Sequence, residues 1–178
     1  MLENPNFQPM SGDHQAPELQ EVETPKGELY LRFFVAEGSE FALPAIGIHR
    51  IIEQAPDFVT PVPNVSPLLL GTLNQQGRVI WVVDLSQFLG CGQSVNTDRA
   101  EIPVVAIEEQ GTMLGLAVDQ VVGTDWLDAE ALETTASPSE EMAPFLKGEW
   151  PLKSNSESNS PLKLLDHVAI LRSGRWVS

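Results

Sequence analysis

Positive charge is scarce in this sequence. Ten lysines and arginines face 25 aspartates and glutamates, which gives a formal net charge of −15. Proteins that bind DNA, RNA or anionic lipid use cationic side chains that release counterions from the phosphates. The composition therefore argues against nucleic acids and lipid headgroups as partners. An acidic chain is better suited to meeting basic patches on other proteins.

Cysteine and long apolar runs are also scarce. The single cysteine, Cys91, cannot form a disulfide within the chain, and no basic cluster surrounds it that would make its thiol reactive. The longest apolar run covers residues 79–83, far short of the roughly 20 residues of a transmembrane helix. The sequence begins without the basic and apolar regions of a secretory signal. We therefore expect a cytoplasmic protein with no direct membrane insertion.

Arrangements typical of catalysis or cofactor binding are missing. The sequence has no glycine-rich phosphate loop motif, no paired nucleophile and base, and no His or Cys spacing typical of a metal site. Asp84 and Asp166 could form a carboxylate pair for acid–base chemistry. Each of them, however, follows an apolar strand and precedes a short amphipathic stretch, which favours a helix N-cap. We predict no enzyme, no metal and no cofactor.

Short apolar runs separated by glycine and proline turns dominate the rest of the chain. Residues 1–26 are acidic and rich in proline, and we predict a disordered leader there. Residues 29–35 with 41–44, and residues 102–107 with 114–118, predict two β-hairpins. The polar stretch at residues 153–160 predicts a mobile loop.

Two parts of the chain resemble each other. Residues 164–171 repeat the pattern of residues 82–89: two apolar strand residues, an aspartate, then an amphipathic stretch. The spacing of roughly 80 residues indicates a diverged duplication. We therefore predict a mainly β fold of two small five-stranded β-barrels with a few short helices. The first barrel would cover residues 27–92 and the second residues 99–178.

One group of segments resembles the CheW family, the adaptor domain of bacterial chemosensory systems. Residues 70–77 and 81–85 are similar to the family patterns K-G-V-x-N-L-R-G and V-P-[IV]-V-D-L. Residues 113–121 resemble V-V-G-[IL]-x-V-D-x-V, and residues 145–148 resemble Y-L-x-G. The segments occur in the family's order, and the similarity covers about residues 28–172.

The resemblance implies two barrels packed around a shared hydrophobic centre. It also implies an adaptor that joins the cytoplasmic tip of a methyl-accepting-type receptor to the regulatory domain of a histidine autokinase. Five positions correspond to protein-binding residues: Ile48, Gly71, Asn74, Gln76 and Gly115. On this mapping, Gly71→Asp should weaken receptor coupling without unfolding the protein.

The chain departs from the family pattern at Gln76, where an arginine is usual. Arginine offers five fixed donors and a permanent charge, whereas glutamine is neutral, so we expect a co-adapted receptor. The four tryptophans fit a divergent branch that serves type IV pilus motility, including phototaxis. Two alternatives stay open at this point. One is a small β-barrel ligand-binding protein or hydrolase using acidic residues, and the other is a nucleic-acid binder of the same barrel type, which the negative charge disfavours.

Overall fold

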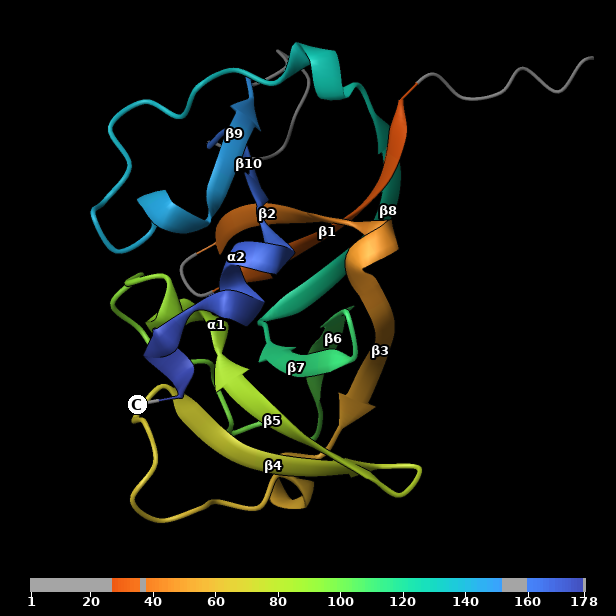
Figure 1. Cartoon of the computed structure of the whole chain (residues 1–178), viewed down its shortest axis with the longest axis vertical. Coiled ribbons are helices and arrows are strands. Elements are labelled where there is room, and N and C mark those ends of the chain that lie inside the picture. Colours follow the sequence, from red (N-terminus) through yellow and green to blue (C-terminus); the bar gives the residue numbers. More distant parts are fainter. Residues whose placement is uncertain (1–26, 36–37, 152–159, 178) are drawn as a thin grey trace, which may run out of the picture.

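The computed structural model describes residues 27–35, 38–151 and 160–177. The expected leader at 1–26 and nearly all of the polar loop at 153–160 lie outside the described residues. The described chain forms two five-stranded sheets at opposite ends of the molecule, with the two short α-helices between them (Figure 1). The prediction of a mainly β fold with two five-stranded units and a few short helices is therefore confirmed.

The two sheets, named sheet A and sheet B here, have the following strand orders. Sheet A consists of β8 (Gln120–Leu127), β1 (Glu28–Val35), β2 (Ser39–Pro44), β10 (Leu162–Leu165) and β9 (Leu146–Trp150). Sheet B consists of β3 (Ile48–Gln54), β6 (Ile102–Glu109), β7 (Thr112–Ala117), β5 (Arg78–Asp84) and β4 (Leu69–Gln75). Both predicted hairpins are present, as β1–β2 and β6–β7.

The helices are short. The α-helices are α1 (Leu85–Phe88) and α2 (His167–Arg172). Five 3₁₀ turns complete the described elements: η2 (Ala45–Gly47), η3 (Pro56–Phe58), η4 (Ala129–Ala131), η5 (Ala143–Phe145) and η6 (Gly174–Trp176). Across the described ranges, no helix has the length and apolar character needed to cross a bilayer.

The topology agrees with the predicted duplication. Replacing each strand by the one five places away in the chain converts the order of sheet A into that of sheet B. In both sheets the strand before the α-helix runs parallel to a strand of a hairpin: β5 pairs with β7, and β10 pairs with β2. The side chain of Asp84 caps α1 and that of Asp166 caps α2, which confirms the predicted N-caps.

The sheets do not follow the two halves of the chain. We expected one barrel from residues 27–92 and another from residues 99–178. Instead, the β1–β2 hairpin of the first half lies in sheet A with β8, β9 and β10, and the β6–β7 hairpin of the second half lies in sheet B. Each half thus contributes two strands to the sheet that contains three strands of the other half. The physical cause is the long-range pairing of β1 with β8 and of β6 with β3.

Both sheets curl strongly without closing into complete barrels. Within the described residues, the two edge strands of a sheet do not pair with each other along their length. The chain that follows β3 forms a single bridge to β4 through Thr60 and Thr72, and the chain that follows β8 forms a single bridge to β9 through Glu133 and Glu149. These bridges bring the edges of each curled sheet close together.

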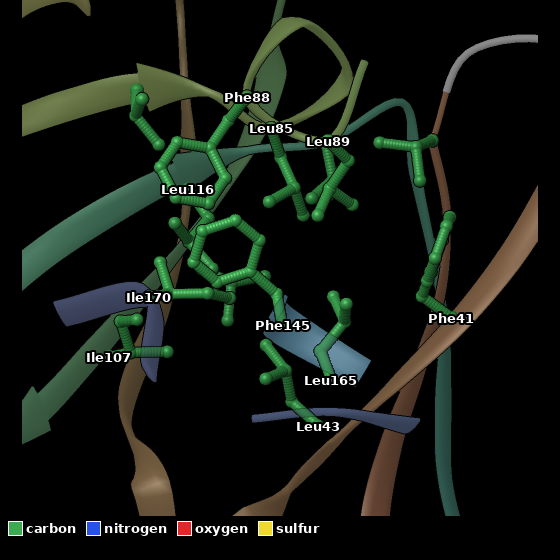
Figure 2. Packing of buried hydrophobic residues seen from close by; sticks show 14 of the residues in the cluster. Phe41, Leu43, Leu85, Phe88, Leu89, Ile107, Leu116, Phe145, Leu165 and Ile170 are labelled. Atoms are coloured by element: carbon green, nitrogen blue, oxygen red, sulfur yellow. The ribbon is translucent and has the colours of Figure 1, made fainter. Parts of the chain in front are cut away.

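The largest hydrophobic cluster lies between the sheets. Side chains from sheet A, such as Phe41 and Leu43, meet side chains from sheet B, such as Ile107 and Leu116, and the helices add Phe88 and Ile170 among others (Figure 2). We call this the central cluster. It corresponds to the expected shared hydrophobic centre.

A smaller cluster fills the concave side of each sheet. In sheet B it contains Ile52, Ile80 and Val104, and in sheet A it contains Tyr30, Trp150 and Leu164. Strands such as β5 and β6 are therefore covered on both faces. This accounts for their nearly continuous apolar sequences, because a strand buried on both faces loses the usual apolar–polar alternation.

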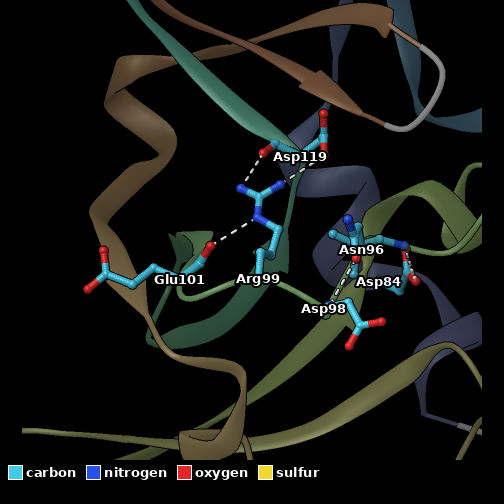
Figure 3. Close-up of polar contacts among 7 residues, drawn as sticks. Asp84, Asn96, Asp98, Arg99, Glu101 and Asp119 are labelled. Carbon is cyan, nitrogen blue, oxygen red and sulfur yellow. Dashed lines mark hydrogen bonds and ion pairs between the residues drawn. The ribbon is translucent and has the colours of Figure 1, made fainter.

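The segment between the halves is held by side-chain contacts (Figure 3). Arg99 donates from Nε to the Glu101 carbonyl at 2.9 Å and from Nη1 to Asp119 Oδ1 at 2.9 Å. Its Nη2 also donates to the Asp119 carbonyl at 2.7 Å. Earlier in the same segment, the Val95 amide donates to Asp84 Oδ2 at 2.9 Å. The linker is therefore tied to the ends of β5 and β7.

Candidate protein-binding surface

Gly71 and Gly115 lie in one row across sheet B. Gly71 on β4 is paired with Val82 on β5, and Val82 is paired with Gly115 on β7. The row continues to Ala106 on β6 and Arg50 on β3. The structure therefore brings together two of the five expected site residues, which are 44 positions apart in the printed sequence.

Both glycines are buried by the chain itself. A Cβ atom at Gly71 would lie 2.1 Å from the Thr60 carbonyl oxygen, and its φ of +147° disfavours any L side chain. A Cβ atom at Gly115 would lie 2.9 Å from Val104 Cγ1. The glycines thus permit close backbone approach and tight curling of sheet B. A partner at this place would meet the segment around Thr60 rather than Gly71.

Asn74 and Gln76 lie at the β4–β5 turn, which projects from the end of sheet B (Figure 1). Asn74 Oδ1 accepts a hydrogen bond from the Gly77 amide at 3.1 Å, so this side chain stabilises the turn. Gln76 has a left-handed φ of +51° and is exposed. Both residues are exposed, and the side chain of Asn74 is engaged in the turn.

Ile48 begins β3 at the margin of the central cluster. It is half-buried and is paired with Ile107 on β6, which in turn is paired with Leu114 on β7. Two residues earlier, the side chain of Ile46 is 94% exposed. An apolar surface thus continues from the interior to the outside of the molecule near η2.

The open end of curled sheet B forms a hollow that we call the sheet B mouth. Its floor is apolar, and its rim is polar and partly positive. The floor is lined by Ile52, Ile80, Ala106 and Met113, and the rim by His49, Arg50, Gln75, Gln76 and Arg78. Gln76 therefore belongs to a larger constellation that contains two arginines.

Sequence reasoning missed Arg50 and Arg78. Each lies two positions before an isoleucine of the sheet B concave cluster, Ile52 and Ile80 respectively. Because side chains two apart in a strand share a face, this spacing places both arginines on the concave side, next to the apolar floor. Where the family pattern has an arginine, Gln76 is neutral. The positive charge of the sheet B mouth comes from Arg50 on β3 and Arg78 on β5 instead.

Hydrogen bonds hold the rim in place. Arg50 Nη1 donates to Gln75 Oε1 at 3.1 Å, and Arg78 Nη2 donates to the Gly111 carbonyl at 3.0 Å. Glu108 Oε2 lies 2.9 Å from His49 Nδ1, and its Oε1 lies 3.9 Å from Arg78 Nη1. Among the described residues, Glu108 is thus paired with His49 and Arg78, and no carboxylate lies in ion-pair range of Arg50, which leaves the rim net positive.

The two carboxylates considered for acid–base chemistry are used in the fold. Asp84 accepts amide hydrogen bonds from Gln87 at 3.2 Å and from Val95 at 2.9 Å, and Asp166 accepts from Val168 and Ala169, both at 3.1 Å. Burial raises the pKa of Asp84 above its usual value, although the amide donors act in the opposite direction. In the part of the chain that the structure describes, no three His, Cys, Asp or Glu residues form a group able to hold a metal ion.

Comparisons with known proteins agree with this architecture. The CheW-like domain family matches residues 30–175. Protein PilI of Pseudomonas aeruginosa is 27% identical over 113 residues, which are 63% of this chain and 62% of that protein. This chain therefore aligns with about three fifths of the length of that relative. The crystal structure of the scaffolding protein TtCheW from Thermoanaerobacter tengcongensis superposes with a TM-score of 0.64 at 20% identity, covering 79% of this chain and 89% of that one, so the two share a fold. The family match extends over most of the sequence, and the chain belongs to the family of proteins with a CheW-like domain.

Proposed function

We propose that this chain is a non-catalytic adaptor that couples a chemosensory receptor to a histidine autokinase. It would bind the cytoplasmic tip of a methyl-accepting-type receptor and the regulatory domain of the kinase at the same time. The single observation that carries the proposal is the family match over residues 30–175. The similarity to PilI favours a type IV pilus system over a flagellar one. Control of phototaxis stays a prediction, which the sensory domain of the cognate receptor would test.

The distribution of exposed side chains supports a role in protein binding. Near β3 and the β4–β5 turn, several large apolar side chains are exposed: Ile46, Ile51 and Val79. Ile51 and Val79 alternate along β3 and β5 with residues that line the sheet B mouth, so they lie on the outer face of the same strands. Apolar surface bordered by polar groups is typical of protein interfaces, where a few central residues supply most of the affinity.

The alternative of a hydrolase or ligand-binding protein needs convergent acidic groups in a cavity. Asp84 and Asp166, the pair considered from sequence, instead accept the amide hydrogen bonds of helix caps. In the part of the chain that the structure describes, the carboxylate paired with residues of the sheet B mouth is that of Glu108, and it is engaged with His49. These observations favour the adaptor over the enzyme.

The proposal is tested by mixing the full chain with its cognate histidine kinase and measuring the complex by sizing chromatography. We expect co-elution at tens of micromolar, because a useful scaffold binds in about the micromolar range. The same kinase without its CheW-like regulatory domain is the control. Absence of a complex between folded partners at that concentration would refute kinase coupling.

Receptor coupling needs a separate measurement. A purified cytoplasmic fragment of the cognate receptor, titrated with the full chain in a calorimeter, should show saturable binding. Gln76→Ala should weaken that binding, whereas Asn74→Ala should act mainly through the stability of the turn, because Asn74 Oδ1 is bonded to the Gly77 amide. Equal affinity of the Gln76→Ala variant and the wild type would remove Gln76 from the receptor site.

A further inference from the structure

Building on the proposed receptor-coupling function, we propose that the sheet B mouth is an anion-binding site. Its ligand is a glutamate or aspartate side chain of the receptor, and Arg50 and Arg78 bind the carboxylate. The inference goes beyond the proposed function because it names the chemistry of the contact and the residues that make it.

The position of the two arginines fits such a ligand. Arg50 and Arg78 come from β3 and β5, and Gln75 and Gln76 at the end of β4 complete the rim between them. Planar guanidinium groups bind carboxylates with two parallel hydrogen bonds, a geometry that a single lysine cannot offer. Below them, Ile52 and Ile80 provide an apolar floor for the methylene groups of an incoming side chain.

The positive charge of the rim is only partly neutralised by carboxylates of the described residues. Arg50 has the neutral Gln75 amide as its hydrogen-bond acceptor, and within the described residues no carboxylate lies in ion-pair range of it. Arg78 shares Glu108 with His49, at the long separation of 3.9 Å. A carboxylate from outside would therefore meet two cations that one acidic group does not neutralise.

In sheet A, by contrast, an arginine is neutralised by carboxylates of the chain itself. Arg32 on β1 donates from Nε to Glu40 Oε1 at 2.7 Å and from Nη1 to Asp125 Oδ2 at 3.1 Å. Glu40 is almost completely buried. Two carboxylates thus surround one arginine in sheet A, whereas in the described part of sheet B Glu108 lies 3.9 Å from Arg78 and no carboxylate is paired with Arg50. The duplicated fold carries an internally satisfied charge network at one end and a net positive rim at the other.

The overall charge of the chain makes this rim selective. A protein of net charge −15 repels acidic partners over most of its surface. An acidic side chain can approach closely only where positive charge is concentrated, so the sheet B mouth would set the orientation of an acidic receptor segment as well as hold it.

A test that needs no receptor uses acetate as the probe. Sodium acetate is titrated into isotopically labelled full-length protein, and the Nε–Hε signals of the arginines are followed by NMR at constant ionic strength. We expect saturable shifts of the Arg50 and Arg78 signals. Arg172 is the internal control, because it is exposed at the end of α2, outside the sheet B mouth. Shifts of Arg50 and Arg78 no larger than that of Arg172 would overturn the anion site, whatever the receptor does.

The second test compares receptor binding by charge-matched variants. We expect the double variant Arg50→Gln/Arg78→Gln to bind the receptor fragment at least about tenfold more weakly than the wild type. The reason is that the receptor carboxylate loses its cationic partners at the interface. Lys147→Gln/Arg172→Gln removes the same charge from exposed positions outside the sheet B mouth and should bind as the wild type does. Equal weakening of both double variants would mean a general charge effect and would overturn the proposal.

The two tests separate the hypotheses. If acetate binds at Arg50 and Arg78 and the wild type fails to bind the receptor, receptor coupling is wrong and so is the named ligand, while the anion site stands. If the wild type binds the receptor and the arginine variants bind equally well, only the further inference fails. Should the double variant have a lowered unfolding midpoint, Arg50→Gln and Arg78→Gln are measured singly.

Discussion

Gly71 and Gly148 occupy equivalent positions in the two sheets and have the same function. A Cβ atom at Gly71 would lie 2.1 Å from the Thr60 carbonyl oxygen, and one at Gly148 would lie 2.7 Å from the Glu133 carbonyl oxygen. Their φ angles are +147° and +154°. In both places the glycine allows the chain leaving an edge strand to bridge back to the opposite edge, which shapes the curl of the sheet.

The first prediction concerns these glycines. Gly71→Ala and Gly148→Ala should each lower the free energy of unfolding by about 2–4 kcal/mol, through backbone strain and collision with a carbonyl oxygen. Gly77→Ala is the control, with a positive φ but no atom within 4 Å of the added Cβ. It should cost about 1 kcal/mol. Urea unfolding measures all three.

The result also bears on the expectation from sequence that Gly71→Asp weakens receptor coupling without unfolding the protein. From the structure we expect loss of the fold instead, because the side chain would collide with backbone. A stable Gly71→Ala variant, equal to the wild type in urea, would contradict this account and restore Gly71 as a candidate contact residue.

The second prediction follows from the exchange of hairpins between the halves. Residues 1–96 and 97–178, produced separately, should each lack a cooperative unfolding transition, since each fragment leaves strands without partners. Mixed in equal amounts, they should regain the circular dichroism spectrum and the unfolding transition of the intact chain. A fragment that unfolds cooperatively by itself would show that a half is an independent barrel after all.

The third prediction concerns Asp84. Burial raises its pKa above the usual value of 3.8, so the folded state binds the proton more tightly than the unfolded state does. The stabilisation linked to this proton is complete below pH 3.8 and is lost as pH rises through the folded-state pKa. Relative to Asp84→Asn, the wild type should therefore become less stable as pH rises from 3.8. Urea unfolding of both proteins at several pH values measures the difference, and a wild-type advantage that grows with pH would contradict it.

The fourth prediction uses Tyr30, the single tyrosine of the chain. Burial, the hydrogen bond that its hydroxyl donates to Glu28 at 3.0 Å, and the nearby Asp128 raise its pKa to about 12. The ultraviolet absorbance of tyrosinate should therefore appear near pH 12, and near pH 10 in denaturant. Glu28→Gln should lower the folded value.

The same shift predicts alkaline sensitivity. Because the folded-state pKa of Tyr30 is raised, the associated stability is present below pH 10 and is lost as pH rises towards 12. Circular dichroism recorded in parallel shows whether the chain is still folded where the phenol titrates. Ionisation near pH 10 in a folded chain would mean that Tyr30 is more accessible than the structure has it.

Local features were well predicted from the sequence because local chemistry determines them. The turn residues between residues 102–107 and 114–118 specify the β6–β7 hairpin, and the position of Asp84 and Asp166 after apolar strands specifies two helix caps. The family patterns at residues 70–85 and 113–121 cover most of β4, all of β5 and most of β7, and they reach the start of β8. The sequence did not reveal which groups contact the predicted site residues. Gly71 was expected at a binding surface, because nothing in the sequence indicates that the Thr60 backbone lies against it.

The sequence by itself determined the strands, the caps, the duplicated plan and the membership of the CheW-like family. These depend on patterns of neighbouring residues, or on a resemblance between aligned segments. Only the tertiary structure decided which strands share a sheet and that Arg50 and Arg78 meet around one hollow. Both depend on pairings between residues far apart in the chain, such as β6 with β3 and β7 with β5. These pairings are stabilised by burial on both faces of the sheet. The order of residues along the chain does not specify which strands are buried against each other.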